Sequence, residues 1–165
     1  MRRNARSFST AGLFGVAVLA LAAAAAVSSR AAAQYTGNSP GWLEGASGYS
    51  DAAKLSKSSG TPMFVYFRTD WCPYCKEFER ELLSSPKVEA YLRELVRVKI
   101  NPETGQREGK LADAYNVQGY PGLYWQKNPG EAPVRITRTT RTSSGESRLK
   151  TPDEFIAGIR QAAMQ

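Results

Sequence analysis

The two cysteines of this chain, Cys72 and Cys75, are the residues whose type and spacing could do chemistry. Only Pro73 and Tyr74 separate them, and they lie where an apolar run gives way to a helical pattern. Two thiols at this spacing could form a structural disulfide, contribute ligands to a metal ion, pack as small apolar side chains, or act as a redox couple. The chain has no other cysteine, so these four alternatives cover its thiol chemistry.

A structural disulfide and a metal centre both fit this pattern poorly. Closing so short a loop stabilises a fold by only about 2 kcal/mol in the loop-entropy model. A structural zinc site needs four ligands, usually Cys and His, and the chain offers two cysteines and no histidine. We therefore expect no metal and no cofactor, although a cluster completed by a second chain or an outside thiol stays open. The absence of histidine also excludes Cys–His and Ser–His–Asp catalysis.

The redox interpretation follows from the position of Pro73. Proline is tolerated in the first turn of a helix, because the N–H that it lacks would have no partner there. Cys72 then lies at the N-cap and Cys75 one turn later on the same face, which is close enough for a disulfide. Free N–H groups at the helix start, and the neighbouring Lys76, stabilise a Cys72 thiolate. We therefore predict that Cys72 is the more exposed and the more acidic thiol.

The elements that must position this motif follow an α/β pattern. The apolar run 63–67 predicts a buried strand directly before the motif, and the alternating segment 96–100 predicts a half-exposed strand. A helix should begin at Ser50 or Asp51. Further helices and strands are expected after the motif, from Pro86, at 110–117, just after Pro121, at 134–139, and at 151–163 with a capping box. The order α-β-α-α-β-α-β-β-α indicates one domain with a mixed sheet and one terminal hairpin.

The first 33 residues are predicted to be a secretory signal peptide. They have a basic start, an uncharged stretch at 11–27 and an Ala-x-Ala arrangement that ends at Ala33, where we expect cleavage. The alternative is an uncleaved signal anchor in the membrane. Export to the periplasm or secretion would place the cysteines in a compartment that permits disulfides. Residues 34–49, rich in Gly, Ser and Pro, are expected to form a flexible arm before a domain at 50–165.

The charge of the exported part is ordinary. The chain has 22 Lys and Arg against 15 Asp and Glu, and four arginines but no acids lie in residues 1–33. Subtracting those four leaves 18 basic and 15 acidic residues, so we expect no nucleic-acid partner and no stable membrane insertion after cleavage. The most basic stretch is interpreted as a solvated hairpin edge in preference to a site for an acidic partner or a membrane surface; it contains Arg135, Arg138, Arg141, Arg148 and Lys150.

Three separated segments resemble the thioredoxin superfamily. They are "MFVYF" running into "RTDWCPYCK", then "VRVKINPETG", then "YNVQGYPGLYWQKNPGE", and the resemblance covers roughly residues 50–163. It is closest to exported, periplasmic or secreted, members of that superfamily. The resemblance implies a thioredoxin-like three-layer α/β/α fold with a mixed central sheet.

The resemblance also implies roles for individual residues. Cys72 becomes the attacking thiol, Cys75 the resolving thiol, and Pro121 a cis-proline that faces them. Residues expected to border a substrate groove are Trp71, Pro73, Tyr74, Tyr120 and Pro121. Tyr66 stands where thioredoxin has a buried aspartate, and it is expected, with Lys76, to tune the thiolate.

The implied activity is thiol–disulfide exchange with protein thiols and disulfides, with an unidentified redox partner that recharges the cysteine pair. Whether the chain acts as oxidant, reductant or isomerase stays open. Two alternatives remain. One is an iron–sulfur or metal carrier, and the other is a thioredoxin-fold binding module without turnover.

Overall fold

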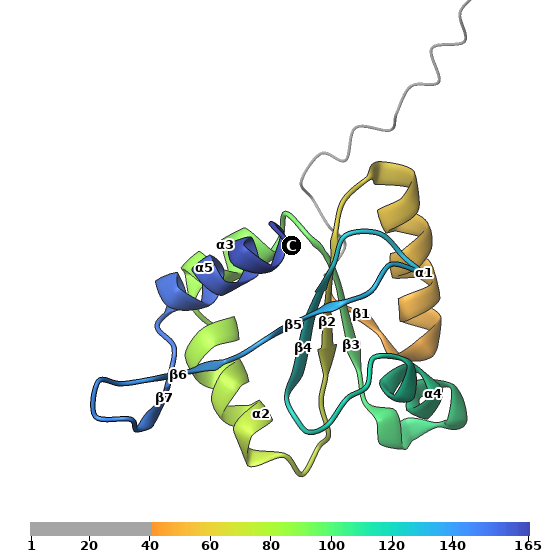
Figure 1. Cartoon of the computed structure of the whole chain (residues 1–165). Coiled ribbons are helices and arrows are strands. Elements are labelled where there is room, and N and C mark those ends of the chain that lie inside the picture. The colour runs from red at the N-terminus through yellow and green to blue at the C-terminus, as the bar shows by residue number, and fades with distance from the viewer. Residues whose placement is uncertain (1–40) are drawn as a thin grey trace, which may run out of the picture. The chain divides into compact units, whose positions relative to one another are not determined.

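The computed structural model describes residues 41–165, and the predicted signal peptide lies outside them (Figure 1). A five-stranded sheet in the order β1-β3-β2-β4-β5 forms the centre of this domain. The first three of these strands are parallel, β4 runs antiparallel to β2, and β5 runs antiparallel to β4. The strands are β1 (Leu43–Glu44), β2 (Met63–Phe67), β3 (Val96–Ile100), β4 (Gly122–Gln126) and β5 (Val134–Ile136). The predicted mixed sheet is confirmed.

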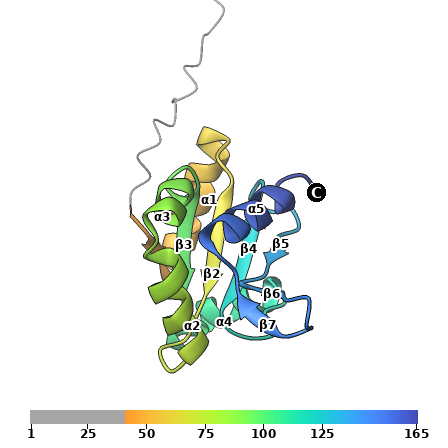
Figure 2. The same ribbon diagram turned by 90° about the vertical axis from the view of Figure 1, so that its left-hand side faces the viewer.

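Helices cover both faces of this sheet, which gives the three layers that the resemblance implies (Figures 1 and 2). On one face lie α1 (Gly45–Ser59) and α4 (Gln106–Ala114). On the other lie α2 (Pro73–Phe78), α3 (Pro86–Leu92) and α5 (Pro152–Ala162). A π-helical turn at Glu79–Leu83 follows α2, and a short 3₁₀ turn at Pro102–Thr104 precedes α4.

Strand β2 is buried on both faces, as its continuous apolar sequence predicts. Phe64 and Tyr66 contribute to the core cluster under α2, α3 and α5, which also contains both cysteines. Met63, Val65 and Phe67 contribute to the cluster under α1 and α4. The strand therefore anchors two cores before the chain reaches the cysteine motif.

Strand β3 is more buried than its alternating sequence predicts. Val96, Val98 and Ile100 face the core, but Arg97 is also buried. Arg97 and Lys99 lie on the other face of the strand, under the ring of Trp42. The ring centroid is 5.6 Å from the Arg97 guanidinium carbon and 5.5 Å from the Lys99 amine. The expectation of a half-exposed strand is therefore wrong, because the segment before α1 covers that face.

The N-terminal part of the domain also differs from the prediction. Leu43–Glu44 pair with β3 as an edge strand, and α1 begins at Gly45 instead of Ser50 or Asp51. Gly45 turns the chain from strand to helix with φ 65°, a conformation that glycine adopts readily. The helix buries small residues such as Ala46 and Gly48, which give a weak apolar signal. The described residues after position 42, predicted to be part of a flexible arm, thus belong to β1 and α1.

A second, two-stranded sheet was not anticipated. The predicted strand at 134–139 ends at Ile136, and the chain then forms a separate hairpin of β6 (Thr139–Arg141) and β7 (Ser147–Leu149). These strands are three residues each and lack an apolar alternation. Their short polar sequence is therefore indistinguishable from a loop.

The predicted capping box at the start of α5 is confirmed. The Glu154 N–H donates to Thr151 Oγ1, and the Thr151 N–H donates to the Glu154 carboxylate. The Arg148 guanidinium, which binds both oxygens of that carboxylate at 2.6 and 2.7 Å, and the Thr151 N–H lower the pKa of Glu154 to about 2. Hairpin and helix are thereby joined through one carboxylate.

We predict that Glu154→Gln destabilises the domain at neutral pH but not in strong acid. Because the folded pKa lies below the ordinary value of about 4.3, the stabilisation is present above that value and is lost as the pH falls towards 2. Urea midpoints of wild type and variant should differ at pH 7 and converge near pH 2. Thr151→Ala is the contrast: it should lose about 1 kcal/mol of cap energy at both pH values. A Glu154→Gln difference that persists unchanged in acid would contradict this account.

Candidate functional site

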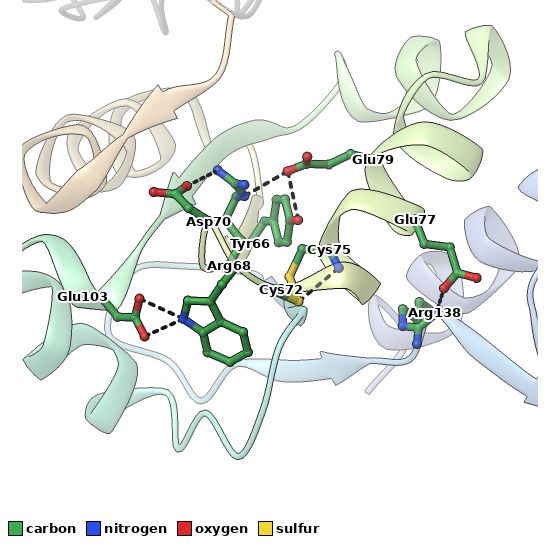
Figure 3. Close-up of a disulfide and its surroundings, with 10 residues drawn as sticks. Tyr66, Arg68, Asp70, Cys72, Cys75, Glu77, Glu79, Glu103 and Arg138 are labelled. Carbon is green, nitrogen blue, oxygen red and sulfur yellow. Dashed lines mark hydrogen bonds and ion pairs between the residues drawn. A yellow bond between two sulfur atoms is a disulfide. The ribbon is translucent and has the colours of Figure 1, made fainter.

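Cys72 and Cys75 form a disulfide at the start of α2, with their Cα atoms 5.3 Å apart (Figure 3). Cys72 is the N-cap of the helix and Pro73 its first residue, as the sequence predicts. The Cys75 N–H donates to the Cys72 sulfur at 3.1 Å. A free helical N–H is thus directed at the sulfur that the resemblance assigns as the attacking one.

Both cysteines are buried in this disulfide form. Cys72 is 2% exposed and Cys75 is 0% exposed, so the predicted difference in exposure is slight in the oxidised state. Two large side chains beside them are exposed instead: Trp71 at 63% and Tyr74 at 58%. The buried disulfide therefore has two exposed aromatic residues next to it in the chain.

Trp71 is held by a residue that the sequence did not single out. Its indole N–H donates to both carboxylate oxygens of Glu103, at 2.9 and 3.0 Å. Its ring lies edge-on to the ring of Tyr120, with centroids 6.2 Å apart. Burial, and then the Glu103 carboxylate, raise the pKa of the Tyr120 phenol. Segments from three parts of the chain thus meet beside the disulfide.

The peptide bond between Tyr120 and Pro121 is cis, the geometry that the resemblance implies. Gly122, the first residue of β4, pairs with Phe67, the last residue of β2. The Tyr120–Pro121 segment therefore lies at the end of the sheet where β2 leads into the cysteine motif. Their role in binding a substrate remains a prediction.

Tyr66 is fully buried and is part of a charged network (Figure 3). Its hydroxyl donates to Glu79 Oε1 at 3.1 Å, and Arg68 Nε forms an ion pair with the same oxygen at 3.0 Å. Arg68 also pairs with Asp70 at 3.1 Å. Burial and the Glu79 carboxylate raise the pKa of the Tyr66 phenol far above its usual value, so the hydroxyl remains a proton donor.

Glu79 therefore supplies a carboxylate on the cysteine side of the core, although Tyr66 occupies the strand position that the resemblance gives to aspartate. It lies four residues after Cys75, which places both on one face of the helical segment. That spacing is the sequence signal that could have found it. No contact supports the predicted tuning role of Lys76. Its exposed ammonium forms no hydrogen bond or ion pair within residues 41–165.

No group of three or more His, Cys, Asp or Glu side chains in the described part of the chain has the arrangement of a metal site. The cysteine pair, at the start of a helix on a mixed α/β/α scaffold, defines a domain of the thioredoxin class. A family model described as thioredoxin-like matches residues 42–124, about half of the chain. The chain belongs to this thioredoxin-like family.

Curated relatives are thiol:disulfide interchange proteins. The chain is 27% identical to DsbD of Ralstonia nicotianae over 114 residues, which are 68% of this chain and 17% of that protein. It is 34% identical to DsbD of Vibrio vulnificus over 79 residues, 46% of this chain and 13% of that protein. The chain therefore spans less than a fifth of the length of these relatives.

The solved structure of a DsbH oxidoreductase superposes with a TM-score of 0.56, covering 76% of this chain and 85% of that chain. The sequence identity is 17%, so the likeness is one of fold.

We predict that, in the reduced protein, alkylation at about pH 6 labels Cys72 well before Cys75. The Cys75 N–H that reaches the Cys72 sulfur lies at the positive end of α2, where a free N–H favours a thiolate over a neutral thiol. Peptide mapping after timed exposure to iodoacetamide gives the two rates. Equal rates, or faster labelling of Cys75, would contradict the assignment.

Proposed function

We propose that this chain is a protein-disulfide oxidoreductase that exchanges disulfides with protein substrates outside the cytoplasm through Cys72 and Cys75. The observation that carries the proposal is the disulfide at the first turn of α2, next to two exposed aromatic residues, Trp71 and Tyr74. Large exposed apolar groups beside a reactive bond are typical of a surface that receives another molecule. Membership of the thioredoxin-like family and the DsbD relatives support the same chemistry.

The exchange proceeds in two balanced steps. In the reduced protein, the Cys72 thiolate attacks one sulfur of a substrate disulfide, forming a mixed disulfide and releasing the other substrate sulfur as a thiolate. The Cys75 thiolate then attacks the Cys72 sulfur and releases the second substrate thiolate. One substrate disulfide becomes two thiols, and two protein thiols become a disulfide. The reverse sequence installs a disulfide, and the reduction potentials of the two couples set the direction.

The surrounding residues bind the client and orient the reacting groups. Trp71 and Tyr74 offer exposed rings next to the cysteines, and Tyr120 adds a ring in contact with Trp71. We assign the backbone of Tyr120 to pairing with an extended client segment, and Pro73 and Pro121 to the apolar border of the groove. The first attack requires the Cys72 thiolate, and the Cys75 N–H lies within hydrogen-bond distance of that sulfur.

The location outside the cytoplasm rests on the first 33 residues, whose sequence is that of a signal peptide. A cysteine pair that turns over must be returned to its starting redox state by a second thiol or disulfide. The redox partner of this chain is therefore expected to be another thiol or disulfide protein. None of the helices within residues 41–165 is both long and apolar enough to span a bilayer.

The test is capture of clients by a resolving-cysteine variant. Cys75→Ser should accumulate mixed disulfides through Cys72, because the thiol that resolves them is gone, whereas Cys72→Ser should abolish turnover and capture nothing. An extract of exported proteins is incubated with each variant, and adducts are separated on non-reducing gels and released by dithiothreitol.

The double variant Cys72→Ser/Cys75→Ser controls for non-covalent adsorption. A chain whose Cys75→Ser variant forms no adducts, and whose wild type does not reduce or oxidise a disulfide substrate, would be a binding module without turnover.

A further inference from the structure

The β6–β7 hairpin lies on the same side of the sheet as α2, in the half of the domain that holds the disulfide (Figures 1 and 2). From the sequence, the arginines of this basic stretch were interpreted as a solvated hairpin edge. One of them is not solvated: the Arg138 side chain is 17% exposed. Arg138 lies between β5 and β6, and its carbonyl accepts the Lys150 N–H at 2.9 Å, which closes the base of the hairpin. The backbone from which the Arg138 side chain extends is therefore held in place by this hydrogen bond.

The Arg138 guanidinium makes two contacts with the cysteine helix. Its Nη1 lies 2.7 Å from Glu77 Oε2 in an ion pair. Its central carbon lies 4.7 Å from the centroid of the Tyr74 ring, within the range of a cation–π contact. Figure 3 shows Arg138 and Glu77 on the other side of the disulfide from Glu103. Each exposed ring beside the disulfide is thus held by a charged residue from elsewhere in the chain.

The contact with Tyr74 differs from ordinary surface pairing because of where that residue lies. Tyr74 is one of the two residues between the cysteines, and its ring is 58% exposed. An exposed ring without a neighbour samples several rotamers, and fixing it on binding a client lowers affinity. The guanidinium takes one side of the ring and leaves the remainder open. The ring is thereby ordered before a client arrives.

We propose that Arg138 is a positioning residue of the exchange site. It holds the Tyr74 ring in the orientation in which a client polypeptide meets the Cys72–Cys75 disulfide. The inference rests on the proposed exchange of disulfides with proteins, and it adds a residue that the cysteine motif alone does not indicate.

The test compares two substrates of different size. Reduced protein is mixed with a short peptide that carries one intramolecular disulfide, or with 2-hydroxyethyl disulfide, and the second-order rate constant of each reaction is measured. We expect Arg138→Gln to lower the ratio of the peptide rate to the small-disulfide rate about threefold to tenfold, because the freed ring must be ordered by the peptide. The double variant Tyr74→Ala/Arg138→Gln should have the same ratio of rates as Tyr74→Ala alone.

Arg148→Gln is the matched control. It makes the same change in the same hairpin and removes the ion pair with Glu154, but Arg148 has no contact with the cysteine motif in the described structure. Its ratio should equal that of the wild type. An unchanged ratio in Arg138→Gln, or a fall that persists without the Tyr74 ring, would overturn the inference. A wild type that reacts with neither substrate would instead contradict the proposed function.

Discussion

Burial of β2 on both faces is the constraint on which the rest of the structure depends. A five-residue strand with no polar face must lie inside the sheet and be covered by helices on both sides. The chain leaves β2 at the edge of the two cores and continues into α2. The cysteine motif occupies that turn, so the sulfurs are anchored by the core through Cys75 and Phe78 while their neighbours Trp71 and Tyr74 face outward.

The charged contacts around the site have a common arrangement. Glu103 holds Trp71, Arg138 holds Tyr74, and Glu79 receives the hydroxyl of Tyr66. Each joins a residue in or next to the cysteine motif to a different segment of the chain. The aromatic residues supply contact area, and the ionised residues fix where that area lies, because an exposed ring gains little from packing alone.

What the sequence could and could not predict follows from the range of the interactions. The buried strand β2, the N-cap position of Cys72 and the capping box of α5 are local patterns, and all three are present. Strand β1 was missed because its two residues gain their structure from pairing with β3, about 55 residues later. Glu103 and Arg138 were missed as site residues because their partners are 32 and 61 residues away along the chain. No spacing rule connects such pairs.

The hairpin was missed because its short polar strands resemble a loop, whereas its contact with the cysteine helix is long-range. Arg138 looks like one more arginine in a basic stretch, and only the fold brings it to Glu77. Glu79 was within reach of a sequence argument, since helical periodicity places it on the face of Cys75. Tyr66 stands on the strand where the resemblance implies an acid, and the carboxylate comes from the helical segment, at Glu79.

The pKa shifts of Glu154 and Tyr66 have a consequence for titration of the whole domain. One carboxyl moves down to about 2 and one phenol moves upward, so both move away from neutrality. The chain also has no histidine, the side chain whose ordinary pKa falls between about 5 and 8. In that interval the groups expected to exchange protons are the cysteine pair of the reduced domain and the α-amino group. The difference between potentiometric traces of the reduced domain and of the alkylated domain would therefore report the thiols.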